Sequence, residues 1–489
     1  MAFKRVAVEL RRSQSREDRD EQHEFERRGE LGLAGPLRRE LGLALDRWRK
    51  LGLSRTGSRA RDERPPASRA AFRRSLFRSP LSRDLWIYEL GVGLDALGRG
   101  ATTPFVLIYL HDVRGFSFAL AGLVAASFAA AGFLGTFAGG ALSDRLGPRS
   151  TLIGSLVATG GAYCWLAFVT KPWEAFAAMA LSGLGFGAFR TSHSAALATL
   201  AEREDNSLLA FSVNRAMDNF GLGLGALVGG LIATTASPSS FSAIFVVDAA
   251  SSLAFAVVVA IGLRAPIAAA VRQPDQARAS YRAVLRQRAL LALVALNVLY
   301  VCAGYAVFQS ALPIFAKGQA NVTERGIGLL FLVNTFAAAA FQLPALRAIR
   351  NRARLRVLAA VGPIWAVAWL AVAAVGMWLT GTVALTALLG VAVLFAAGEC
   401  ALPVQTMLVT ELAPPELRGR CLGLLPASYA VALSLGPALI GVGLAVSPYL
   451  IWAVAIGVLL VAGVVALALE RTLPAEHRPV GVAAAPQPA

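Results

Sequence analysis

Charged residues are scarce in this chain, and their scarcity excludes an ordinary soluble protein. They make up 16% of the 489 residues, whereas hydrophobic residues make up 56%. Soluble domains carry about 25% charged residues. The alternating ten-residue segments of a transmembrane β-barrel are also missing. The four cysteines have no paired spacing, which argues against a disulfide framework and against a zinc site. They are Cys164, Cys302, Cys400 and Cys421.

Sequence motifs of common enzymes are missing as well. The chain has no H-E-x-x-H zinc motif, no G-x-S-x-G nucleophile motif, no Walker-type phosphate loop and no D-D-x-x-D cluster. We therefore expect neither an enzyme nor a cofactor or metal. Without a nucleotide site, transport by such a protein would use an ion gradient or run passively.

What the chain does contain is a series of long apolar runs. Each is about 20 residues long, which is the length needed to cross about 30 Å of hydrocarbon. Twelve spans are predicted, near residues 85–110, 117–140, 150–170, 173–200, 208–233, 241–263, 288–315, 325–346, 356–379, 382–411, 421–446 and 449–469. The predicted fold class is an all-α polytopic membrane protein.

Basic residues gather in alternate loops and therefore predict the orientation. Arginines crowd the loops after the second, sixth and eighth spans, whereas the loops after the fifth, ninth and eleventh have no Lys or Arg. By the positive-inside rule, both termini are expected in the cytoplasm and the protein in the cytoplasmic membrane. The formal net charge of +17 then favours anionic lipid headgroups, not nucleic acid, as the partner of the basic segments.

The longest internal loop divides the spans six and six. We predict a basic, largely disordered cytoplasmic extension (1–84), a first half (85–263), a central loop (264–287), a second half (288–470) and a tail (471–489). The halves echo one another, because Gly225-Ala-Leu-Val-Gly-Gly230 and Gly436-Pro-Ala-Leu-Ile-Gly441 follow similar polar turns. Two repeated six-helix halves are typical of transporters.

Within the extension, apolar residues recur at helical spacing and basic residues cover the rest of the surface. This pattern predicts a short amphipathic helix on the cytoplasmic leaflet. The alternative is a poorly ordered extension without a role in transport. The apolar positions are Leu37, Leu41, Ala44, Leu45, Trp48 and Leu51.

The most informative motif is the charged turn Gly140-Ala-Leu-Ser-Asp-Arg-Leu-Gly-Pro-Arg149 between the second and third spans. Gly140 and Gly147 would allow close helix approach and a tight turn. Asp144 can accept hydrogen bonds at a neighbouring helix start. Arg145 and Arg149 can pair with carboxylates or lipid phosphates.

This G-x-x-x-D-R-x-G-x-R pattern resembles the loop between the second and third helices of the major facilitator superfamily. In that family the loop latches the two halves together when the transporter faces outward. The resemblance implies the same role for Gly140, Asp144, Arg145, Gly147 and Arg149. The second copy expected after the eighth span, Pro344–Arg350, keeps arginines but has no acidic partner, so any latch there is degenerate.

A glycine series in the fifth span extends the resemblance. The residues Gly221, Gly225, Gly229 and Gly230 form G-x-x-x-G-x-x-x-G-G, which resembles the fifth-helix motif of exporters and proton antiporters. Plain close packing of membrane helices is the alternative interpretation. Two departures weaken the antiporter interpretation. Ala226 stands where the family's fifth-helix motif has proline, and Met179 stands where the family's fourth-helix motif has arginine.

Ionisable residues inside spans are costly and are therefore functional candidates. Asp95 and Arg99 are four residues apart, so they can pair on one helix face. Glu399 has no cation near it in the sequence and is the preferred group for proton loading, because burial favours the neutral acid. Arg190 is the basic residue of the fourth span. Further acidic residues are Glu89, Asp218 and Asp248, the last near enough to the outer surface to reach water.

Aromatic residues in the first and seventh spans have two interpretations. They can line a lipophilic substrate pocket, or they can serve helix packing and the interfacial belts. The residues are Tyr88, Phe105, Tyr109, Tyr300, Tyr305 and Phe308.

Together these features predict a monomeric secondary transporter that works by alternating access. Proton-coupled efflux of a small lipophilic or cationic compound, or of a metabolite, is the expected activity. The alternatives are a proton-coupled uptake symporter and a non-transporting membrane sensor or scaffold that uses the basic extension. Expected partners are the small-molecule substrate, protons and anionic lipid headgroups, and no nucleic acid.

Overall fold

The computed structural model describes residues 81–204, 207–263, 287–349, 352–413 and 418–472. Every described residue belongs to one compact unit, Arg74–Ala489. The amphipathic helix expected over residues 37–51, most of the central loop and nearly all of the C-terminal tail lie outside the described residues. The described residues are helical and contain no strand.

The first half consists of six spans. In order they are α4 (Arg83–Thr102) continued by η1 (Thr103–Phe105), α5 (Val106–Ile108) and η2 (Tyr109–Val113); α6 (Phe118–Leu146); α7 (Pro148–Leu166); α8 (Pro172–Ala201); α9 (Ser207–Ile232); and α10 (Pro238–Val257) continued by η3 (Val258–Gly262). Pro104 lies at the break between α4 and α5, where it removes a backbone donor.

The second half also consists of six spans. They are α12 (Arg288–Tyr300) continued by the π-helix η5 (Val301–Ala311) and α13 (Leu312–Gly318); α14 (Glu324–Ile349); α15 (Arg354–Trp378); α16 (Gly381–Glu399) with α17 (Pro403–Leu412); α18 (Arg418–Val446); and α19 (Leu450–Thr472). Each of the twelve expected spans therefore coincides with a helical segment. The all-α fold with twelve spans in two halves is confirmed.

The two halves differ in how many of their helices are long and apolar enough to cross a membrane. Eight helices of the described residues are long and apolar enough to cross a membrane, and only two of them, α6 and the α10–η3 helix, belong to the first half. The other four spans of that half carry more polar and charged residues. Three of these four spans, α4, α8 and α9, contribute polar side chains to a network that also includes Asp248 and Ser252 of α10.

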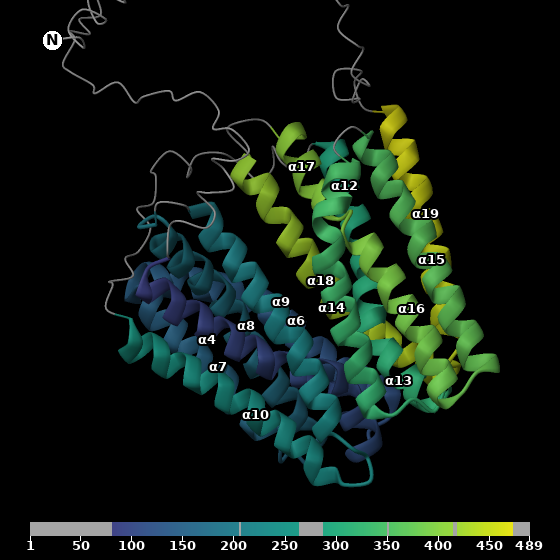
Figure 1. The fold of residues 1–489 in the computed structure, drawn as a ribbon, viewed down its shortest axis with the longest axis horizontal. Coiled ribbons are helices and arrows are strands. Elements are labelled where there is room, and N and C mark those ends of the chain that lie inside the picture. The colour runs from purple at the N-terminus through teal and green to yellow at the C-terminus, as the bar shows by residue number, and fades with distance from the viewer. Residues whose placement is uncertain (1–80, 205–206, 264–286, 350–351, 414–417, 473–489) are drawn as a thin grey trace, which may run out of the picture. The chain divides into compact units, whose positions relative to one another are not determined.

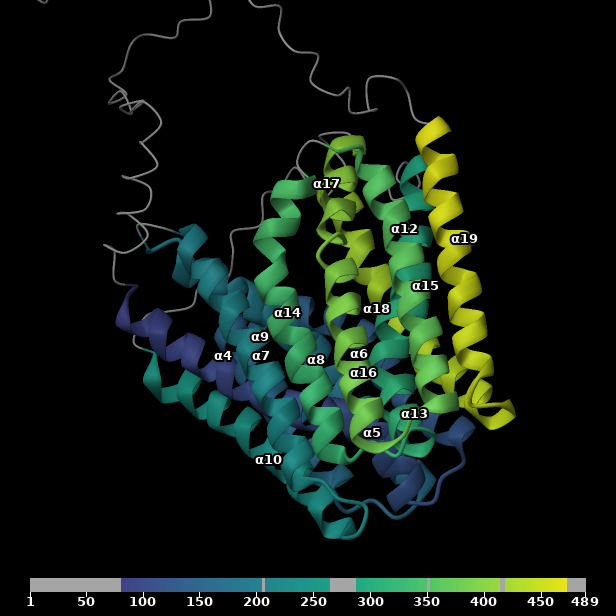
Figure 2. The same cartoon turned by 45° about the vertical axis from the view of Figure 1, so that its right-hand side comes forward.

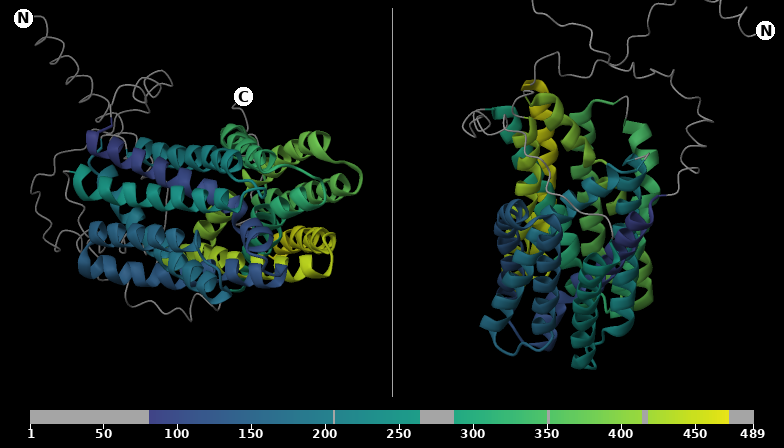
Figure 3. Two further views of the ribbon diagram at one scale, coloured as in Figure 1. Left: turned by 90° about the horizontal axis from the view of Figure 1, so that it is seen from below. Right: turned by 90° about the vertical axis from the view of Figure 1, so that its left-hand side faces the viewer.

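Each half packs within itself and touches the other mainly through two helix pairs. In the first half α4 packs on α9 and α10, and α8 packs on α6 and α7; in the second, α15 packs on α19 and α14 on α16. The two groups are visible by colour in Figures 1 and 2, and Figure 3 gives two further views. The main contacts between the halves join α6 to α18 and α9 to α14.

We name the two ends of the bundle by residues that mark them. The Asp144 end is where α6 ends and α7 begins, and the Lys317 end is where α13 ends and α14 begins. The closest backbone contacts between the halves lie toward the Lys317 end. There a Cβ on Gly122 of α6 would overlap Gly441 of α18, and a Cβ on Gly230 of α9 would overlap the carbonyl oxygen of Glu324.

Candidate functional site

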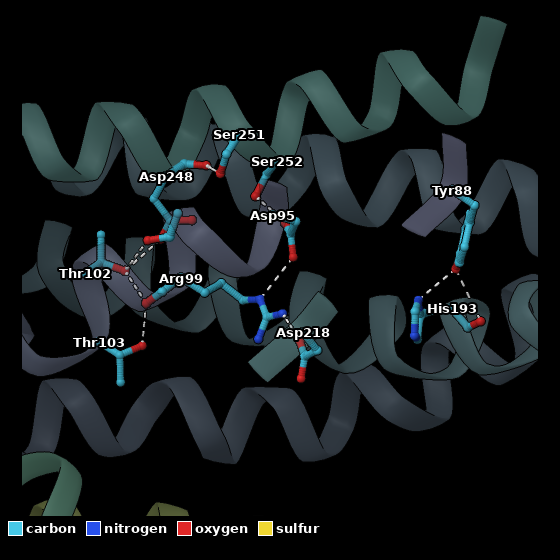
Figure 4. A network of polar contacts seen from close by, with 11 residues as sticks. Tyr88, Asp95, Arg99, Thr102, Thr103, His193, Asp218, Asp248, Ser251 and Ser252 are labelled. Carbon is cyan, nitrogen blue, oxygen red and sulfur yellow. Dashed lines mark hydrogen bonds and ion pairs between the residues drawn. The ribbon is translucent and has the colours of Figure 1, made fainter. Parts of the chain in front are cut away.

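An ion triad lies inside the first half and joins α4 to α9. Arg99 Nε is 3.0 Å from Asp95 Oδ2, and the Arg99 terminal nitrogen is 2.6 Å from Asp218 Oδ1. Ser252 Oγ of α10 donates to the other Asp95 oxygen at 2.8 Å. Figure 4 shows Arg99 reaching between the two carboxylates. The predicted Asp95–Arg99 pair is therefore present in the structure, and Asp218 adds a second counterion.

Asp248 lies beside this triad and is also buried. Thr102 Oγ1 donates to Asp248 Oδ2 at 2.7 Å, from α4 to α10 (Figure 4). The side chain is 0% exposed, so the expectation that Asp248 reaches water is wrong. The cause is the close crossing of α4 and α10 at Gly98, where a Cβ would overlap Ser251.

Two more polar contacts tie α4 to its neighbours nearer the Asp144 end. Asn214 Nδ2 of α9 donates to the Glu89 carboxylate at 3.0 and 3.3 Å. The Tyr88 hydroxyl lies 2.7 Å from His193 Nδ1 of α8, and their rings are stacked. Every acidic residue in the middle of the first half thus has a polar partner within that half.

Glu399 is the acidic residue nearest the middle of the spans in the described part of the second half. It ends α16, and its Oε2 accepts a hydrogen bond of 3.1 Å from Asn334 of α14. The Tyr305 hydroxyl interacts with the same carboxylate, and the Tyr305 ring centroid lies 5.9 Å from that of Tyr429. Glu399, Asn334 and the two tyrosines therefore form one cluster, the Glu399 cluster, built from α16, α14, η5 and α18.

Two arginines of the first half act on the Glu399 cluster. Arg215 of α9 acts electrostatically on Glu399, and Arg190 of α8 acts on Tyr429. Both arginine side chains are exposed. Neither forms an ion pair with a carboxylate in the part of the chain that the structure describes. The predicted group of Asp95, Arg99, Arg190 and Glu399 is thus split: the first two are locked in the triad, and the last two belong to the region between the halves.

The charged turn is more compact than expected. Helix α6 continues through Asp144 and Arg145 to Leu146, and only Gly147, with φ +85°, separates it from α7. The tight-turn role of Gly147 is present. In this conformation Gly140 makes no close approach, because a Cβ there would meet nothing within 4 Å; the preceding Gly139 instead packs on Ala188 of α8.

The other members of the predicted latch lie at the surface of the first half. Asp144 and Arg145 are exposed. Arg149 donates to the carbonyl oxygens of Ala260, at 2.8 Å, and Leu263, at 3.4 Å, at the end of η3. In this conformation Arg149 therefore holds the turn against its own half.

The glycines of the fifth span pack against two different helices. A Cβ on Gly221, Gly225 or Gly229 would overlap α4, whereas one on Gly230 would overlap α14 of the other half. The echo in α18 repeats this division. There a Cβ on Gly436 would overlap Ala306 of η5, and one on Gly441 would overlap α6.

Most of the singled-out aromatic residues are packing residues. Tyr88, Phe105, Tyr109 and Tyr300 are completely buried, and Phe308 is nearly so. Tyr305 is partly exposed and is the member that belongs to the Glu399 cluster.

Several functional candidates were missed by sequence reasoning. Asp218 was noted only as a charge, and no pattern links it to Arg99, which is 119 residues away. Arg215, Asn334 and Tyr429 gave no motif. Arg215 could have been found from the sequence, because it lies eight residues after the start of α9. A basic residue inside a membrane span is costly in free energy, as are the carboxylates Asp95 and Glu399. No group of three or more His, Cys, Asp or Glu that could hold a metal occurs among the described residues.

Comparison with known families decides the relationship. The family model described as Major Facilitator Superfamily matches residues 90–322 and 294–489, which together include both halves. The chain belongs to the Major Facilitator Superfamily. It is accordingly a polytopic membrane protein of this superfamily.

Relatives in this superfamily are similar over parts of the chain. The uncharacterized MFS-type transporter YqjV of Bacillus subtilis is 27% identical over 264 residues, which cover 53% of this chain and 63% of YqjV. YttB of the same organism, also an uncharacterized MFS-type transporter, is 27% identical over 245 residues, covering 49% of this chain and 58% of YttB. The chain therefore spans about three-fifths of the length of these relatives.

Solved structures share the fold. A bacterial homolog of the lysosomal transporter Spinster, in an inward-facing and unoccupied conformation, has a TM-score of 0.64 at 12% identity over 84% of this chain and 99% of that chain. The D-xylose-proton symporter has a TM-score of 0.62 at 18% identity, over 81% of this chain and 99% of the other. At these identities the similarity concerns the superfamily fold.

Proposed function

We propose that this protein is a secondary active transporter that exports a small molecule across the cytoplasmic membrane by alternating access, in exchange for protons. The observation that carries the proposal is the Glu399 cluster, in which Asn334 donates to the Glu399 carboxylate and Tyr305 lies beside Tyr429, within electrostatic range of Arg215 and Arg190 of the other half. A site formed by groups from both halves changes its geometry when the halves move, and this is what transport requires.

The conformation supports an inward-facing state if the Asp144 end is cytoplasmic, as the arginine-rich loops favour. The closest backbone contacts between the halves lie toward the Lys317 end, at Gly122 with Gly441 and at Gly230 with Glu324. The inward-facing state of the similar Spinster homolog agrees with this interpretation. In the opposite state, the Asp144 turn would latch onto the second half.

Glu399 is the proposed proton carrier. The acidic groups of the first half are held by Arg99, Thr102 and Asn214, so their protonation would break contacts inside one half. Glu399 instead has hydrogen-bond partners in its own half and the electrostatic influence of Arg215 from the other half. Proton loading there changes the electrostatic attraction between the halves, which couples the proton to the conformational change.

The charges around the Glu399 cluster change the class of substrate that we expect. Two exposed arginines outnumber the single carboxylate of the Glu399 cluster, and guanidinium groups bind carboxylates and phosphates. A substrate with an anionic group therefore fits better than the cationic compound expected from the sequence. Tyr305 and Tyr429 add ring faces and hydroxyl groups for an aromatic or polar remainder.

The experiment is proton flux in acid-loaded inverted membrane vesicles, screened over anionic, neutral and cationic compounds. Export predicts that an added substrate releases protons from the lumen. Glu399→Gln keeps the shape of the site and should abolish proton release while substrate binding persists. Glu174→Gln, the same substitution at a glutamate outside the Glu399 cluster and the turn, is the matched control. Proton uptake in place of release would overturn the proposed direction.

The second candidate is a proton-coupled uptake symporter. Met179 favours it, since the exporter-type arginine of the fourth span is missing at that position, and the fold is shared with the D-xylose-proton symporter. Accumulation of substrate together with protons in right-side-out vesicles would support this candidate.

A further inference from the structure

A second charged cluster lies at the Lys317 end, far along the spans from Glu399. Lys317 Nζ is 2.9 Å from Asp112 Oδ2 and 3.0 Å from Glu324 Oε1. Glu324 Oε1 also accepts hydrogen bonds of 3.1 Å from the backbone N–H and the hydroxyl of Thr235. One lysine and one carboxylate are thus each shared between two partners.

The four residues come from both halves. Asp112 lies in η2 at the end of the first span, and Thr235 follows α9, so both belong to the first half. Lys317 is in the last turn of α13, and Glu324 begins α14, so both belong to the second. The Asp112–Lys317 pair and the Thr235–Glu324 contact therefore cross between the halves, whereas the Lys317–Glu324 pair stays within one.

Burial makes these contacts stronger than ordinary surface pairs. The side chains of Glu324 and Lys317 are 12% and 19% exposed, and that of Asp112 is 34% exposed. Partial exclusion of water strengthens an ion pair relative to a fully exposed one. Next to it, the backbones of Gly230 and Gly328 approach so closely that neither position has room for a Cβ, which fixes Glu324 against the end of α9.

We propose that Asp112, Lys317, Glu324 and Thr235 form a gate that holds the Lys317 end closed and opens in each transport cycle. Opening breaks the two contacts that cross between the halves. Lys317 keeps Glu324 as its partner when Asp112 departs, so opening leaves neither the lysine nor Glu324 without a counterion. The shared lysine lowers the electrostatic cost of opening while keeping the closed state favoured.

The gate complements the Asp144 turn. The turn is expected to join the halves when the opposite end opens, so the protein has one charged latch at each end. Because the gate is already formed in this structure, its strength sets the fraction of molecules closed at the Lys317 end. This inference does not depend on the substrate or on the direction of transport.

The test is a distance measurement between spin labels on opposite halves at this end. Labels at Ser239 and Thr380, both exposed, are placed in full-length protein whose four cysteines are replaced by alanine, in lipid nanodiscs without substrate. Asp112→Asn should raise the population with the long distance about fivefold, since it removes one partly buried pair across the halves and leaves Lys317–Glu324 intact. Thr235→Val should give a smaller rise.

The control is Glu174→Gln at the same end of the bundle. Glu174 accepts hydrogen bonds from the backbone N–H groups of Thr170 and Lys171, and all three residues belong to the first half. It should leave the distances unchanged. An unchanged distribution in both Asp112→Asn and Thr235→Val, with both proteins folded, would overturn the gate. If Asp112→Asn fails to fold, Thr235→Val alone decides. Failure of vesicle transport would not affect this result, because no transport is measured.

Discussion

The two halves share one fold but are stabilised by different chemistry. The middle of the first half is a polar network in which Arg99 joins Asp95 and Asp218, and Thr102 binds Asp248. The middle of the second half is aromatic: Trp365 stacks on Phe395 with ring centroids 4.6 Å apart. A directional ionic network resists rearrangement because its partners cannot be exchanged cheaply.

The difference suggests a division of labour between the halves. The first half offers two exposed arginines on a frame held by buried ion pairs. The second offers one carboxylate, Glu399, with only a few polar neighbours, among aromatic packing that tolerates small displacements. We infer that the first half acts as the rigid frame and that the protonation step is confined to the second.

The largest effect is expected when the ionic frame loses its cation. Arg99→Met leaves the buried Asp95 and the partly exposed Asp218 without their counterion, which should lower the free energy of unfolding by about 3–5 kcal/mol. Unfolding in SDS micelles, followed by tryptophan fluorescence, measures this loss. Arg190→Met, an exposed arginine on the neighbouring α8, is the control and should cost little. Equal losses for the two variants would show that the triad contributes no special stability.

A smaller effect should reveal the repeat that relates the halves. Gly225→Ala places a Cβ against the Leu97 carbonyl oxygen, and Gly436→Ala places one against Ala306, so α9 or α18 must shift away from the first span of its own half. Each should lower the free energy of unfolding by about 1–3 kcal/mol. The same SDS unfolding measurement applies. Strongly unequal losses would contradict the equivalence of the two glycines.

The aromatic half can be examined by removing one hydrogen bond from its centre. Trp365 is fully buried, and its Nε1 donates to the carbonyl oxygen of Phe395 at 2.9 Å. Trp365→Phe keeps a ring against Phe395 but loses the donor and some volume, which should cost about 1–2 kcal/mol of unfolding free energy. Because no charge is left unpaired, the cost should stay below that of Arg99→Met. A larger cost would show that the aromatic half is the more rigid one.

Sequence reasoning predicted the fold well and the site in part, for physical reasons. Apolar runs and loop arginines are local signals, so the twelve spans follow from them directly. The Asp95–Arg99 pair was predictable because both residues lie on one helix face. The Arg99–Asp218 pair and the Asp112–Lys317 pair of the gate each join residues of two different spans. Whether such residues meet depends on how the helices pack. No local period encodes that information.

The smallest effect concerns the two neighbouring glycines that precede the charged residues of the turn. Gly139 is the glycine that packs on α8, whereas Gly140 faces open space inside the helical part of α6. Gly140→Ala should therefore raise the free energy of unfolding by up to about 1 kcal/mol, because alanine loses less backbone entropy in a helix. Gly139→Ala is the matched variant and should lower it through overlap with Ala188. A transport assay of Gly140→Ala adds a second readout, because the latch between the halves is expected only in the opposite conformation. Undiminished stability together with impaired transport would place Gly140 at a contact that forms when the Asp144 end closes.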